Sequence, residues 1–152
     1  MITMIPKTDA EGRLTAETWP LPLEEAWLER LFRDLFTNHW QELTFGPMIP
    51  GGAYELRCPG GPKSINVGGG YFTVHWGRGG HFHLCIGESK GSPELIAHRR
   101  PRAVELVRGF DKSGHPVTWS LQTVNGHGES TISIYFPNPF LTEEDGLAET
   151  PN

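Results

Sequence analysis

Two histidines and a cysteine alternate along one short segment of the chain, as His81, His83 and Cys85. Successive side chains of a β-strand point to opposite faces, so a strand here places these three on one face and Phe82 and Leu84 on the other. Neutral imidazole is the commonest metal ligand in proteins and also carries protons. The segment is therefore the first candidate site in the sequence.

Aromatic residues precede the two histidines at a spacing that matters for this site. A hairpin closed by the four residues Gly77–Gly80 pairs Trp76 with His81. In that register Phe72 and Trp76 share the face of His81 and His83. We therefore expect two imidazoles above an apolar aromatic surface, which must be covered by another element or by a flat apolar ligand.

Three interpretations of the histidine pair remain open. In the first, His81 and His83 are hydrogen-bonded polar residues at the rim of a sheet and have no ligand. In the second, they bind Zn²⁺ or Fe²⁺ together with Glu88. Two histidines and, after four intervening residues, a glutamate resemble the first metal motif of cupins, and this resemblance implies a non-haem metal-dependent enzyme.

The third interpretation is a haem or porphyrin site. His83 is then the iron ligand, and His81 is a second ligand or a distal hydrogen-bond donor. Phe72 and Trp76 pack on the porphyrin ring in this hypothesis. The residues do not decide whether bound haem is carried, sensed or degraded, so the presence of an enzymatic activity stays open.

A haem site also needs cations for the two propionates. The only basic cluster of the chain is Arg99, Arg100 and Arg102, beside His98 and shortly after the histidine segment. Guanidinium groups suit carboxylates, although basic residues are also favoured at the end of a helix by its dipole. We expect His98 and these three arginines to hold the propionates.

Composition limits the class of protein. The chain has 152 residues, 37% of them apolar, with 19 glycines and 13 prolines, which fits one turn-rich globular domain. A net charge of −5 with scattered basic residues argues against nucleic acid or a membrane as partner. Cys58 and Cys85 lie in no metal or redox spacing, which favours a cytoplasmic setting.

Periodicity predicts an α+β fold with a curved, mostly antiparallel sheet. A helix is expected over Leu23–Trp40 because apolar residues recur at helical spacing, and Ser92 and Pro93 predict a second, short helix. Period-two segments predict the strands, which are Ala53–Arg57, Tyr71–Trp76, His81–Ile86, Val104–Phe110, Val117–Val124 and Thr131–Phe136. Both helices are expected to pack on the sheet.

Residues 1–152 are expected to form one domain, with a flexible arm over 1–17, a globular core over 18–140 and an acidic tail over 141–152. Asn125-Gly126 is typical of a two-residue hairpin turn, which pairs Trp119 with Ile132. In that turn His127 is expected to point to solvent.

The last hairpin carries a family resemblance. Residues 119–124, followed by 126–135, resemble the closing hairpin of bacterial haem-utilisation and haem-carrier proteins. With residues 51–57, 81–87 and 137–139, the whole chain resembles a small uncharacterised bacterial family distantly related to them. The resemblance implies helices on curved antiparallel sheets and haem as ligand. A metal-free module that binds another flat apolar small molecule, or a second copy of itself as a homodimer, is the remaining hypothesis.

Overall fold

The computed structural model describes residues 2–142, 144, 146–149 and 151. These residues form an α+β fold with two helices, a seven-stranded antiparallel sheet and two small sheets, which confirms the predicted class. The helices are α1 (Glu25–Asn38) and α2 (Pro93–Arg99). The strands are β1 (Ile5–Thr8), β2 (Leu14–Pro20), β3 (Thr44–Gly46), β4 (Met48–Ile49), β5 (Gly52–Ala53), β6 (Leu56–Arg57), β7 (Ser64–Gly68), β8 (Tyr71–His75), β9 (His81–Cys85), β10 (Pro101–Phe110), β11 (Pro116–Asn125) and β12 (Ser130–Tyr135).

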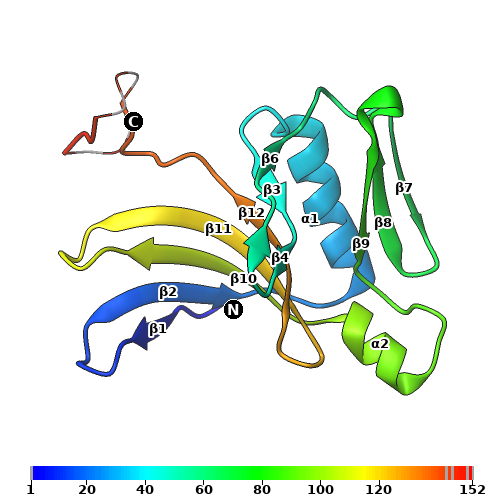
Figure 1. The fold of residues 1–152 in the computed structure, drawn as a ribbon, viewed down its shortest axis with the longest axis horizontal. Helices are drawn as coiled ribbons and strands as arrows, with labels where there is room; N and C mark the ends of the chain where they lie inside the picture. Colours follow the sequence, from blue (N-terminus) through cyan, green and yellow to red (C-terminus); the bar gives the residue numbers. More distant parts are fainter. Residues whose placement is uncertain (1, 143, 145, 150, 152) are drawn as a thin grey trace.

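The large sheet has the order β1-β2-β10-β11-β12-β3-β6, and β10, β11 and β12 form its central meander (Figure 1). The second sheet, β7-β8-β9, carries the histidine segment on β9, which is an edge strand. Strands β4 and β5 form a separate two-stranded ribbon. The histidines therefore do not belong to the large sheet.

The first strands of the large sheet come from the segment expected to be a flexible arm. Residues 5–8 pair with β2, and β2 pairs with β10 from Ala16↔Gly109 to Pro20↔Glu105. The expectation for residues 1–17 is wrong because backbone hydrogen bonds, rather than apolar burial, hold this hairpin: all four residues of β1 are exposed.

Helix α1 packs between one end of the large sheet and the sheet of β7, β8 and β9 (Figure 1). Its apolar stripe buries Leu28, Phe32, Leu35 and Phe36. The ring centroid of Phe36 lies 5.2 Å from that of Phe45 on β3 and 6.2 Å from that of Phe72 on β8. The stripe is thus the centre of the core, as expected for an amphipathic helix covering a sheet.

Helix α2 begins where the sequence predicts, because the Ser92 hydroxyl accepts a hydrogen bond from the Leu95 amide at 3.3 Å. Its C-terminal half contacts the turn between β11 and β12. There the Gly126 amide donates to the Ala97 carbonyl at 2.8 Å. A Cβ at position 126 would lie 2.9 Å from that oxygen, so glycine permits the close approach.

The β11–β12 hairpin exists, but its register differs from the expectation. Leu121 pairs with Ile134 and Thr123 with Ile132, four residues beyond the expected partners, because the turn over residues 125–129 is three residues longer than Asn125-Gly126 and the register shifts by one more between Thr123 and Val124. The difference is an even number of residues, so the apolar face is unchanged. The Asn125 side chain stabilises the longer turn by accepting from the amides of His127 and Glu129, both at 3.0 Å.

The predicted acidic tail lies partly outside the described residues, at positions 143, 145, 150 and 152. Within the described part, Leu141 and Leu147 form an isolated bridge. Among the described residues, neither helix has the length and apolar character that a membrane span requires.

Candidate functional site

The β8–β9 hairpin carries the predicted site in a register that differs from the expected one. His75 pairs with His81, and Thr73 pairs with His83. The loop runs over residues 76–80 and contains a single 3₁₀ turn at Gly77–Gly79, so it is one residue longer than expected. One extra residue exchanges the two faces of a strand relative to its partner.

Phe72 and Trp76 consequently lie on the face opposite to His81 and His83. Phe72 is fully buried and its ring centroid is 5.8 Å from that of Phe32 on α1. Trp76 is 8% exposed, and its indole Nε1 donates to the Gly60 carbonyl at 2.9 Å. The expectation that these rings support a ligand beside the histidines is therefore wrong: both belong to the core.

Three exposed imidazoles gather on the outer face of the same sheet. The ring centroids of His81 and His83 are 4.7 Å apart, and those of His75 and His81 are 5.6 Å apart with nearly parallel planes. Nδ1 of His83 lies 2.8 Å from the Thr73 hydroxyl, and Nδ1 of His75 accepts from the Gly77 amide. These bonds orient the rings of His75 and His83.

A hollow of about 310 Å³ lies beside this histidine face, and we name it the histidine hollow. It is bordered by the edge strand β9, the last turn of α2 and the first residues of β12. Its lining consists of Pro47, Tyr71, Phe82, His83, Leu84, Cys85, His98, Arg99, Thr131 and Ile132. The structure thus places His83, His98 and Arg99 together, whereas His81 is not part of this lining.

The three predicted arginines do not act as one group. Arg99 lines the histidine hollow and donates from Nη1 to the Lys90 carbonyl at 3.1 Å. Arg100 and Arg102 line a shallow surface on another side of α2, and Arg100 lies 3.9 Å from Glu88. Only Arg99 therefore lies where a ligand of the hollow can reach it.

The cupin-like set of His81, His83 and Glu88 is not assembled, because Glu88 turns toward Arg100 and its side chain is 90% exposed. The described residues contain one group of three His, Cys, Asp or Glu side chains whose ligand atoms lie within 4.8 Å of one another. That group is Glu94, His98 and His127. Sequence reasoning found only His98 of the three.

The sequence carries a signal for one of the two missed residues, Glu94, and none for His127. Glu94 and His98 are four residues apart on α2 and so face the same side of the helix. His127 joins them only through the packing of α2 on the β11–β12 turn. His127 is exposed, as expected, but its ring centroid also lies 4.1 Å from that of His98.

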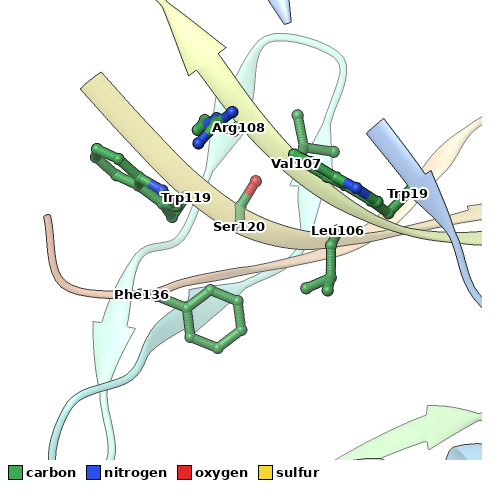
Figure 2. Close-up of a pocket in the computed structure, with 7 residues that line it drawn as sticks. All are labelled: Trp19, Leu106, Val107, Arg108, Trp119, Ser120 and Phe136. Atoms are coloured by element: carbon green, nitrogen blue, oxygen red, sulfur yellow. The ribbon is translucent and has the colours of Figure 1, made fainter. Parts of the chain in front are cut away.

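A second hollow lies on the large sheet, and we name it the aromatic hollow. It has a volume of about 320 Å³ and is lined by Trp19, Leu106, Val107, Arg108, Trp119, Ser120 and Phe136. Figure 2 shows Leu106 and Phe136 extending to the same side of the strands, with the indoles of Trp19 and Trp119 on either side. Arg108, its one charged lining residue, is paired with Glu17. A homodimer formed through such an apolar surface stays a prediction.

Burial raises the pKa of both thiols. It raises the pKa of Cys58 to about 11 and also raises the pKa of Cys85, whose Sγ donates to the Gly87 carbonyl. We expect iodoacetamide to alkylate Cys58 in the native protein at pH 8 about a hundredfold more slowly than a free thiol, because thiolate is the nucleophile. In the Cys85→Ser variant Cys58 is the one remaining thiol, so the mass increase of this variant over time measures the rate of alkylation. The same variant unfolded in urea is the control.

The raised pKa of Cys58 also makes the stability of the protein depend on pH. Since the folded pKa of Cys58 lies above its ordinary value of 9.0, the unfolded state loses the proton first. The free energy of unfolding therefore falls as pH rises from about 9 to 11. Rapid alkylation of the native protein at neutral pH would contradict the burial of Cys58.

The arrangement defines a class of protein: an α+β domain whose helices pack on curved antiparallel sheets. The crystal structure of ChuX has this fold, with a TM-score of 0.51 and 14% identity over 88% of this chain and 68% of that chain. The chain belongs to DUF7676, a family of unknown function, whose model matches residues 5–152. No curated protein matches the chain significantly.

Proposed function

We propose that this protein binds haem or a related porphyrin in the histidine hollow, with Nε2 of His83 as the iron ligand. ChuX, whose fold this chain shares, is a haem-utilisation protein, the class that the closing hairpin of the sequence also resembles. The observation that carries the proposal is the meeting of His83, His98 and Arg99 in one largely apolar hollow.

The residues of the hollow fit such a ligand. When Nδ1 of His83 donates its proton to the Thr73 hydroxyl at 2.8 Å, Nε2 keeps the lone pair that an iron ligand needs. Phe82, Leu84 and Ile132 supply apolar contacts, and Arg99 supplies a cation for a propionate. A volume of about 310 Å³ is near the lower end of the usual 300–1,000 Å³ range, so one edge of the porphyrin is held and the rest is exposed.

The test is a haemin titration of the purified protein, followed by the Soret absorption. We expect His83→Ala to weaken haemin binding at least about tenfold, because a ligand bond to iron is lost, and Arg99→Gln to weaken it less, because an exposed ion pair contributes little. His115→Ala is the matched control, since it removes an imidazole whose side chain is 75% exposed in the β10–β11 turn.

Wild-type protein without a Soret shift would refute haem binding, and an unchanged affinity of His83→Ala would refute the ligand assignment. Trp119→Ala separates the two hollows. If it abolishes binding while His83→Ala does not, the occupant lies in the aromatic hollow.

The aromatic hollow supports a second candidate function, the binding of a flat apolar small molecule without a metal. Its lining contains two indoles and a phenyl ring, and the single cation there is already paired with Glu17. Aromatic side chains of this kind stack on planar ligands.

A further inference from the structure

The contact between α2 and the β11–β12 turn brings two imidazoles to one carboxylate. Oε1 of Glu94 lies 3.6 Å from Nε2 of His98 and 3.4 Å from Nε2 of His127. Glu94 and His98 share a face of α2, whereas His127 is contributed by the turn. Both imidazoles present the same nitrogen, Nε2, to the same oxygen.

These separations match those of a metal coordination shell. A tetrahedral Zn²⁺ ion with ligand bonds of about 2.0–2.1 Å separates its ligand atoms by about 3.3 Å. Two of the three ligand pairs are within a few tenths of an ångström of that value, and all three ligand atoms lie within 4.8 Å of one another. Two histidines and a glutamate form a recurrent Zn²⁺ ligand set that leaves a fourth position for water.

The second nitrogen of His98 has a partner of the kind that metal-bound histidines use. Nδ1 of His98 lies 3.6 Å from Oε2 of Glu129. The same oxygen accepts a hydrogen bond from the side-chain Nδ2 of Asn125 at 2.9 Å. A neutral imidazole has a single N–H, so it cannot donate to carboxylates on both sides. With a metal on Nε2 and the proton on Nδ1, both nitrogens of His98 are satisfied.

Two hydrogen bonds to carbonyl oxygens of α2 hold together the two elements that carry these ligands. The Gly126 amide donates to the Ala97 carbonyl at 2.8 Å, and the side chain of Asn125 donates to the His98 carbonyl at 3.0 Å. Asn125 itself is only 3% exposed. These two hydrogen bonds thus fix the relative position of the elements that carry Glu94, His98 and His127, although the three ligand side chains are exposed.

We propose that Glu94, His98 and His127 form a Zn²⁺ site, with Glu129 as the residue that positions His98. This site goes beyond haem binding: it shares His98 with the histidine hollow, but its other ligands, Glu94 and His127, are not part of that hollow and it does not use His83. It joins two elements across the surface and leaves one coordination position to solvent.

The experiment is a calorimetric titration of the metal-free, haem-free protein with ZnCl₂, with Co²⁺ absorption as a second readout of tetrahedral coordination. We expect one Zn²⁺ per chain, a loss of more than a hundredfold in affinity for Glu94→Gln and His127→Ala, and about a tenfold loss for Glu129→Gln. Each of these side chains is exposed enough for the variants to fold, which the unchanged melting temperature without metal verifies.

His39→Ala is the matched control. His39 is also an exposed imidazole between two carboxylates, but Asp34 and Glu42 approach opposite nitrogens of its ring, at 3.9 and 3.4 Å, so they cannot converge on one ion. Unchanged binding by His39→Ala and His83→Ala supports the site and separates it from the haem proposal. Absence of Zn²⁺ binding, equal binding by Glu94→Gln, or loss of binding in His39→Ala or His83→Ala would overturn it.

Discussion

Phe72→Ala is expected to lower the free energy of unfolding by about 3–5 kcal/mol, the usual cost of truncating a buried phenylalanine. Phe72 is fully buried and its ring contacts those of Phe32 and Phe36 on α1. In a chain of this size that loss corresponds to a fall in melting temperature of about 6–20 °C. Urea unfolding followed by tryptophan fluorescence measures it.

Ile49→Ala is the control, because Ile49 is 59% exposed and its truncation should change the free energy of unfolding by no more than about 0.5 kcal/mol. Haemin affinity, measured on folded protein, should not change in Phe72→Ala, since Phe72 faces away from His83. A stable Phe72→Ala protein with weakened haemin binding would mean that Phe72 contacts the ligand beside His83, and it would contradict the register of β8 and β9.

The two register predictions show what local pattern determines and what it does not. Period-two alternation located β8, β9, β11 and β12, because apolar and polar residues alternate along these strands. Pairing between strands depends on the length of the loop. The partners across β11 and β12 lie four residues from the expected ones, which preserves the faces, whereas the partners across β8 and β9 lie one residue from the expected ones, which exchanges them.

Two of the strands that were not predicted, β1 and β7, were missed for different reasons. Strand β1 is entirely exposed, so its sequence has no apolar face to mark it, and backbone pairing to β2 creates it. Strand β7 does alternate, with Ile65 and Val67 packed against the core, but it has only two apolar residues, and it pairs with β8. A single sequence carries little local signal for such tertiary pairing.

In the candidate sites, too, local sequence pattern indicates some residues, whereas others come together only through tertiary contacts. His83, His98 and Arg99 were identified from residue type and local spacing, and the structure places them around one hollow. His127 could not be assigned from spacing, since its contact with Glu94 and His98 requires α2 to dock on a distant turn. Asn125 was recognised as a turn residue, but its hydrogen bond to the His98 carbonyl is tertiary.

Asn125→Ala is expected to lower the free energy of unfolding by about 2–6 kcal/mol, because it removes four hydrogen bonds whose net contributions are about 0.5–1.5 kcal/mol each. The side chain donates to the His98 carbonyl and to Glu129, and accepts from the amides of His127 and Glu129. With 3% of its surface exposed, water cannot replace these bonds without opening the turn. Chemical unfolding measures the loss, with the exposed Asn66→Ala as control.

The same substitution should also weaken Zn²⁺ binding, although Asn125 is not a ligand. Without its amide, both the His98 backbone and the Glu129 carboxylate lose an anchor, so the ligands must be ordered when the metal binds. Stability within about 0.5 kcal/mol of wild type would instead mean that the backbone bonds Asn125–Glu129 and Gly128–Asn125 suffice to hold the turn. In that case the hydrogen bond from the Gly126 amide to the Ala97 carbonyl would hold α2 on the hairpin without the help of Asn125.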